Sequence, residues 1–119
     1  MNRLARHELA QRELRARLEK EGQVVISAST TAPCDVVSLD RRSGAPTCWE
    51  VKTAKGRKAS DLSRDERTFG QTVEGIGIPF VIARYRVVGD RVVGTPDLYR
   101  PFGASLESRE TEIVLEVTP

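Results

Sequence analysis

Two residues near the middle of the chain have the types and the spacing of a catalytic pair. Glu50 and Lys52 are two positions apart in a strand-forming segment, so both side chains should lie on one face of the strand. Trp49, Val51 and Thr53 take the other face, which is apolar enough to belong to a core. Charged groups in such a strand are costly unless they are paired or bind a metal ion.

Asp35 adds a second carboxylate to this pair. It opens the preceding strand, fifteen residues upstream of Glu50, and a hairpin would place the two residues side by side. Two carboxylates hold a hard cation such as Mg²⁺ through oxygen, and the cation polarises a phosphate and lowers the pKa of a bound water. Lys52 would orient that water or stabilise the developing charge. The residues therefore predict metal-assisted phosphodiester hydrolysis, with Mg²⁺ as the cofactor and Mn²⁺ as a substitute.

The tripeptide Glu50-Val51-Lys52 alone has a simpler explanation, because a cross-strand salt bridge of Glu50 with Lys52 or an arginine is common. The context favours the catalytic interpretation. Asp35 lies upstream, and the basic loop that follows the strand would contact phosphates close to the site. A solvated turn is the alternative for this loop, whose basic residues are Lys55, Arg57 and Lys58.

Hydrophobic periodicity and turn residues predict the order helix, strand, strand, strand, helix, strand. The expected helices are residues 4–20 and about 60–74, and the expected strands are 23–28, 35–39, 47–53 and 80–85. Residues 91–93 would extend the sheet. Pro96, Pro101 and Gly103 indicate irregular chain, and residues 112–117 alternate like an edge strand. This order is typical of an α/β sandwich with a mixed central sheet flanked by helices.

The composition fits one soluble domain. The chain has 119 residues, of which 39% are hydrophobic and 30% charged, and it contains neither a membrane-spanning apolar run nor an apolar signal region. Cys34 and Cys48 lack the ligand set of a zinc site, and we expect free thiols in the cytoplasm of a prokaryotic cell or a virus-infected host. The net charge of +2 is too small to establish a nucleic-acid partner by itself.

Two motifs carry a resemblance to a known family. Residues 33–35 (Pro-Cys-Asp) followed by residues 50–52 (Glu-Val-Lys) resemble the PD-(D/E)xK nuclease superfamily, although Cys34 interrupts the usual Pro-Asp pair. Residues 49–57 and 62–66 resemble the VRR-NUC branch. The compact chain is also similar to archaeal-type Holliday junction resolvases, and the likeness covers about residues 4–86. It implies a restriction-endonuclease-like fold.

The resemblance also implies a set of site residues. Asp35, Glu50 and Val51 would hold the metal ion, with Asp35, Glu50 and Lys52 as the catalytic core. Ser29 corresponds to a loop serine that assists catalysis in the resolvases, although the sequence by itself slightly favours an ordinary polar loop. Glu66 stands where VRR-NUC domains usually carry glutamine.

The first helix of this family supplies an active-site carboxylate, and three residues are candidates for that position. Glu8 and Glu13 have the right chemistry, and Glu8 has the better spacing to Gly22. Gln11 lies nearer the centre of the apolar stripe, but we expect Glu8 to be the catalytic residue of this helix. His7, the sole histidine, is expected on the helix surface or at an interface.

Together these features predict one nuclease domain over residues 1–119, with a core at about 4–86 and a C-terminal extension at 87–119. The expected activity is structure-selective cleavage of branched DNA, above all four-way (Holliday) junctions, by a homodimer that does not bind membranes. One alternative is a repair or restriction-like nuclease acting on duplex or flap DNA. Others are a non-catalytic nucleic-acid-binding module of the same fold and a subunit of a larger repair or replication complex.

Overall fold

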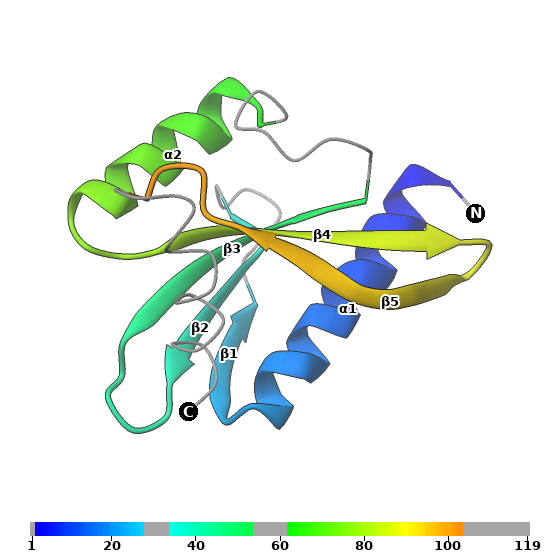
Figure 1. The fold of residues 1–119 in the computed structure, drawn as a ribbon, viewed down its shortest axis with the longest axis horizontal. Helices are drawn as coiled ribbons and strands as arrows, with labels where there is room; N and C mark the ends of the chain where they lie inside the picture. The colour runs from blue at the N-terminus through cyan, green and yellow to red at the C-terminus, as the bar shows by residue number, and fades with distance from the viewer. Residues whose placement is uncertain (1, 28–33, 54–61, 104–119) are drawn as a thin grey trace.

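The computed structural model describes residues 2–27, 34–53 and 62–103. Five strands form one mixed sheet in the order β1-β2-β3-β4-β5, in which β3 and β4 are parallel and the other neighbours antiparallel (Figure 1). The predicted α/β fold is thus confirmed. The elements are α1 (Arg3–Lys20), β1 (Gln23–Ser27), β2 (Val36–Asp40), β3 (Pro46–Lys52), α2 (Arg64–Gly75), β4 (Phe80–Val88) and β5 (Arg91–Tyr99).

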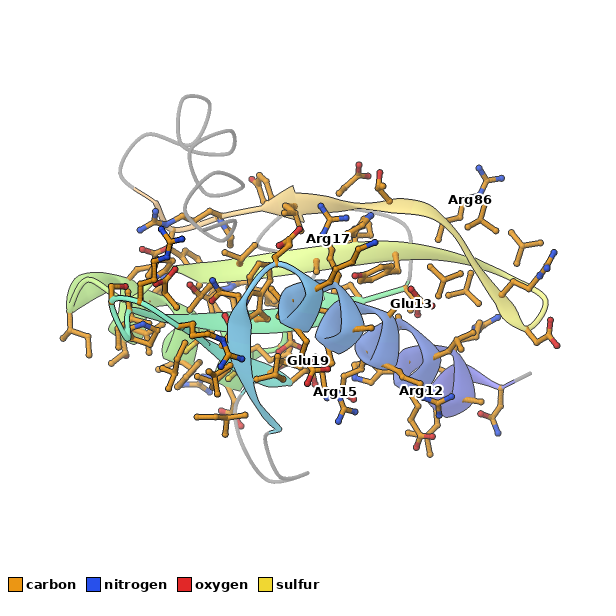
Figure 2. All side chains as sticks on the ribbon, turned by 90° about the horizontal axis from the view of Figure 1, so that it is seen from below. Arg12, Glu13, Arg15, Arg17, Glu19 and Arg86 are labelled. Atoms are coloured by element: carbon orange, nitrogen blue, oxygen red, sulfur yellow. The ribbon has the colours of Figure 1, made fainter. Side chains whose placement is uncertain are left out.

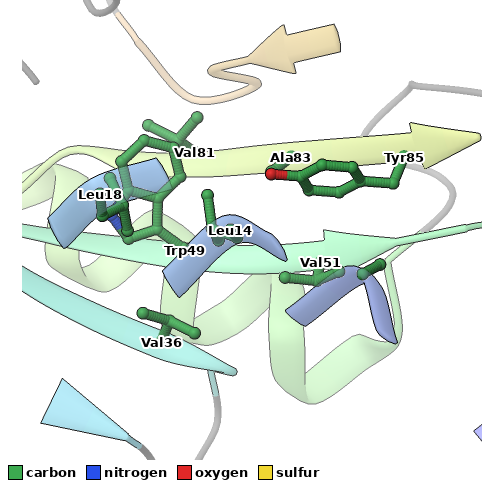
Figure 3. Packing of buried hydrophobic residues seen from close by; sticks show 9 residues of the cluster. Leu14, Leu18, Val36, Trp49, Val51, Val81, Ala83 and Tyr85 are labelled. Carbon is green, nitrogen blue, oxygen red and sulfur yellow. The ribbon is translucent and has the colours of Figure 1, made fainter. Parts of the chain in front are cut away.

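The two helices lie on opposite faces of the sheet. The buried face of α1 carries Ala10, Leu14 and Leu18, spaced four residues apart as one helix face requires. They pack against Trp49 and Val51 of β3 and against neighbouring apolar residues of β2 and β4 (Figure 3). A second cluster, on the α2 side, contains Val73, Phe80, Ile82, Leu62 and both cysteines. The alternation of β3 therefore places Trp49 and Val51 in the first core, as predicted, and directs Glu50 and Lys52 towards α2.

The β2–β3 hairpin sets the register of the central strands. Val36 lies opposite Trp49. The turn between the strands is held by the Asp40 side chain, which accepts hydrogen bonds from the backbone N–H groups of Arg42 and Ser43 at 2.9 Å each. Gly44 completes this turn with a φ of 74°, a conformation that glycine adopts without strain. The predicted hairpin is confirmed.

The sheet extends further along the chain than the sequence indicated. β4 runs to Val88 and β5 to Tyr99, so the prediction of irregular chain at Pro96 was wrong. Proline is tolerated there because β5 lies at the edge of the sheet that the described strands form, where the outer side of a strand needs no N–H donor. No helix in the described ranges is long and apolar enough to cross a membrane. The strand predicted at 112–117 lies outside the described residues.

Candidate active site

The start of β2 and the end of β3 bring the two predicted carboxylates together. The backbone N–H of Asp35 donates to the Trp49 carbonyl at 3.0 Å, which continues the hairpin one residue beyond Val36. Asp35 therefore lies opposite Glu50. The juxtaposition expected from the hairpin is confirmed.

Asp35 is held by contacts from two elements. Its Oδ2 accepts a hydrogen bond from the backbone N–H of Val51 at 2.8 Å, and its Oδ1 lies 3.3 Å from Nε2 of His7 on α1. Gln11, one turn further along α1, donates to the Asp35 carbonyl at 3.0 Å. Burial raises the pKa of Asp35, but the hydrogen bonds from His7 and Val51 outweigh it and bring the pKa below its usual value.

The helix residues that reach the site differ from those expected. His7 was predicted on the helix surface or at an interface, and its side chain is 31% exposed, but its hydrogen bond to Asp35 also links α1 to the site and raises the pKa of His7 above 6.5. Of the three first-helix candidates, Gln11 contacts Asp35, whereas Glu8 and Glu13 are exposed. The i, i+4 spacing of His7 and Gln11, which places them on one helix face, is the sequence signal for this pair.

Glu50 is the most deeply buried acid of the site, with 3% of its surface exposed. Burial raises its pKa to about 10, and a hydrogen bond with Glu66 and the negative charge of Asp35 act in the same direction. The ammonium group of Lys52 lies 3.6 Å from Glu50 Oε2 and opposes the shift. Lys52 alone therefore does not offset the cost of burying the ionised Glu50 carboxylate. A further positive charge beside Glu50 would offset it.

Glu66 ties Lys52 to the beginning of α2. Its Oε1 lies 3.0 Å from Lys52 Nζ and also accepts a hydrogen bond from the backbone N–H of Ser63 at 2.8 Å. Ser63 Oγ in turn accepts from the backbone N–H of Glu66 at 3.1 Å, which completes a capping box. The sequence analysis left Glu66 without a role. The Ser-x-x-Glu motif at 63–66 was the available signal for the cap, though not for the contact with Lys52.

The ionisation of Glu66 makes the free energy of unfolding depend on pH in the acidic range. Burial raises its pKa, but hydrogen bonds with Glu50, Ser63 and Lys52 lower it to about 2. Because the pKa of Glu66 is lower in the folded state than its value of about 4.5 in the unfolded chain, ionised Glu66 stabilises the fold above about pH 4.5. This contribution to the unfolding free energy disappears as the pH falls from about 4.5 towards about 2. We expect Glu66→Gln to flatten the decline of the unfolding free energy over that range, measured by urea titration at each pH. Parallel curves for the two proteins would contradict this assignment.

Several predicted site residues lie outside the part of the chain that the structure describes. They are Ser29, before β2, and the basic residues Lys55, Arg57 and Lys58, after β3. Within the described ranges, no group of three or more His, Cys, Asp or Glu side chains is arranged to hold a metal ion. Among the described residues, Asp35 and Glu50 are the facing carboxylate pair at the end of β3, and Glu66 is engaged with Lys52 and Ser63.

The fold is similar to that of a known nuclease. The structure matches that of Hjc, a Holliday junction resolvase from the archaeal hyperthermophile Archaeoglobus fulgidus, with a TM-score of 0.51 and 22% sequence identity. The match covers 75% of this chain and 74% of the resolvase. No protein-family model and no curated protein sequence matches the chain. The similarity therefore lies in the fold, and the predicted α/β architecture of a mixed sheet flanked by helices is what the two structures share.

Proposed function

We propose that this protein is a metal-dependent DNA endonuclease that cleaves branched DNA, with four-way junctions as its preferred substrate. The observation that carries the proposal is the meeting of Asp35, Glu50 and Lys52 at one end of β3. The fold, which is similar to that of a Holliday junction resolvase, supports the choice of substrate.

The donor set fits a hard divalent cation. Asp35 and Glu50 offer carboxylate oxygens, which suit Mg²⁺ or Mn²⁺. Val51 can contribute only its main-chain carbonyl, because its side chain is apolar and fully buried. That carbonyl points to the side of Asp35, since the N–H and C=O groups of a strand residue point the same way and the Val51 N–H donates to Asp35. When bound, the cation would polarise the scissile phosphate and acidify a water.

The raised pKa of Glu50 supports the same proposal. A divalent cation would favour the ionised form of Glu50 and offset its burial. A non-catalytic DNA-binding module would gain nothing from a buried carboxylate that faces phosphates, so this residue also favours the enzyme over that alternative.

The chain's own groups would prepare the site for reaction. His7 and Gln11 hold Asp35 in place from α1. Lys52, fixed by Glu66, would orient the attacking water or donate to a phosphate oxygen as negative charge develops. Because each chain carries one such site, paired cuts in two strands require two copies, and we propose a homodimer with two-fold symmetry.

The test is cleavage of matched four-way, flap, single-stranded and linear duplex DNA by the purified protein. We expect Mg²⁺-dependent cutting of the four-way junction, loss of activity in EDTA and its return with Mn²⁺. Sedimentation should give the mass of a dimer. If the protein is a monomer that binds junction and duplex equally, we would infer that its substrate is duplex or flap DNA and not the four-way junction. Full cleavage in EDTA would refute the metal mechanism, and no cleavage of any substrate with either metal would refute the nuclease.

A further inference from the structure

We propose that a groove between α1 and β5 binds the sugar-phosphate backbone of the DNA as it leaves the candidate active site. The inference rests on the proposed function for its partner, DNA, and adds a binding surface to it. The groove, called here the α1–β5 groove, consists of two adjoining hollows of about 470 and 290 Å³. They share Tyr85, Gly94 and Thr95 as lining residues and so adjoin there; α1 lines the smaller hollow, and the larger one is lined by β4, β5 and Thr53.

The groove begins next to the candidate active site. The larger hollow is lined by Thr53, which follows Lys52 in the chain, and by Arg84, which lies opposite Lys52 in the parallel β3–β4 register. The smaller hollow continues along α1 to Lys20. The α1 residues that line it run from Glu13 to Lys20, which corresponds to about 10 Å of helix axis. At about 3.4 Å per nucleotide, this length matches about three nucleotides of one strand.

The charge of the groove matches a polyanion. Four cationic side chains line it, two in each hollow, against the two carboxylates of Glu13 and Asp97. In Figure 2 the Arg17 side chain lies on the side of α1 that faces β5, whereas Arg15 and Glu19 lie on the opposite side. Such a surface attracts phosphates without reading bases, as a nuclease selective for shape requires. The four cations are Arg17, Lys20, Arg84 and Arg86.

Arg17 can bind a phosphate while keeping its contact within the helix. Its Nε lies 3.4 Å from Oε1 of Glu21, the residue that caps the C-terminal end of α1. A guanidinium carries five N–H donors in a planar fork, so donors remain for a second anion.

A second, independent observation comes from Tyr85, at the boundary of the two hollows. The side chain is 3% exposed, and among the described residues its hydroxyl has no hydrogen-bond partner. Burial raises the pKa of Tyr85 to about 12, so the hydroxyl stays a neutral donor at physiological pH. Buried hydroxyls nearly always find a partner. A phosphate oxygen, or a water held by the phosphate, would supply one here.

The experiment compares two double variants that lose the same charge. Arg17→Gln with Lys20→Gln removes two cations from the groove, and Arg41→Gln with Arg42→Gln removes two exposed cations from the β2–β3 turn. Binding of a labelled four-way junction and a linear duplex is measured in EDTA over a range of salt concentrations. We expect the groove variant to lose about two units from the slope of log affinity against log salt, and tenfold or more in affinity. The turn variant should stay close to wild type.

Arg86→Gln, at the far side of the larger hollow, should lose about one unit of slope. Thermal unfolding of each variant shows whether it is folded. If the Arg17/Lys20 variant does not fold, the result of Arg86→Gln decides the test, because Arg86 is exposed and its replacement should not disturb the fold. Equal losses in the groove and turn variants, or none in either, would overturn the groove. If the wild-type protein binds DNA through the groove but cleaves nothing, the proposed nuclease fails while the groove stands.

Discussion

Replacing Glu50 with glutamine, or Asp35 with asparagine, is expected to lower the single-turnover cleavage rate about a thousandfold or more. Each change removes a ligand of the proposed cation, whose contribution to the transition state is several kcal/mol. In EDTA, DNA affinity should stay the same or increase in Asp35→Asn, which removes negative charge that repels phosphates. It should stay the same in Glu50→Gln, because the raised pKa keeps the metal-free Glu50 neutral near pH 7. The measurement is cleavage of a four-way junction with Mg²⁺ at saturating enzyme, together with junction binding in EDTA.

Glu50→Gln has a second expected effect, on stability. The pKa of Glu50 is about 10 in the folded state and about 4.5 in the unfolded state. The contribution of Glu50 to the unfolding free energy is therefore fully present only below pH 4.5, and it is lost as the pH rises from about 4.5 to about 10. At pH 7 Glu50 therefore destabilises the metal-free fold, and glutamine should stabilise it by about 1 kcal/mol or more. Mg²⁺ should raise the melting temperature of the wild type and leave that of the variant unchanged.

The matched control for both effects is Glu19→Gln, the same substitution at an exposed position of α1. It should cleave and melt like the wild type. If Glu50→Gln cleaved at the wild-type rate, the site would not lie at the end of β3, whatever the stability measurement gave.

Local patterns were sufficient to predict the core of the candidate site. The period of two in a strand places Glu50 and Lys52 on one face, and the short polar turn before β3 makes a hairpin, which brings Asp35 opposite Glu50. Both deductions need only residues that are close in sequence. The roles of these three residues in catalysis remain predictions that the variants would test.

The supporting residues could not be predicted in the same way, because their contacts join distant segments. His7 reaches Asp35 across 28 positions, and Glu66 reaches Lys52 across 14. Which α1 residues face the start of β2 depends on how the helix packs on the sheet, and family spacing pointed instead to Glu8. Pro96 was misjudged for a related reason, since only the sheet order reveals that β5 is the last of the described strands, where proline is tolerated.

Lys52→Ala is expected to reduce the single-turnover cleavage rate about 100- to 1,000-fold, the typical effect of removing one group that stabilises transition-state charge. The Lys52 ammonium lies 3.6 Å from Glu50 and 3.0 Å from Glu66, so it is held at the edge of the proposed metal site without being a ligand. The expected signature is therefore a lower rate with Mn²⁺ affinity retained, measured by calorimetry on the free protein.

Glu66→Gln serves as the graded comparison for Lys52→Ala. Glutamine keeps an oxygen that can accept the Ser63 N–H but loses the charge that holds Lys52, so we expect a loss of about tenfold, smaller than that of the alanine variant. Raising the Mg²⁺ concentration should rescue neither variant. Full rescue of Lys52→Ala by Mg²⁺ would show that Lys52 organises the cation and not the reacting phosphate. An unchanged rate in Lys52→Ala would remove Lys52 from the mechanism and leave Asp35 and Glu50 as the site.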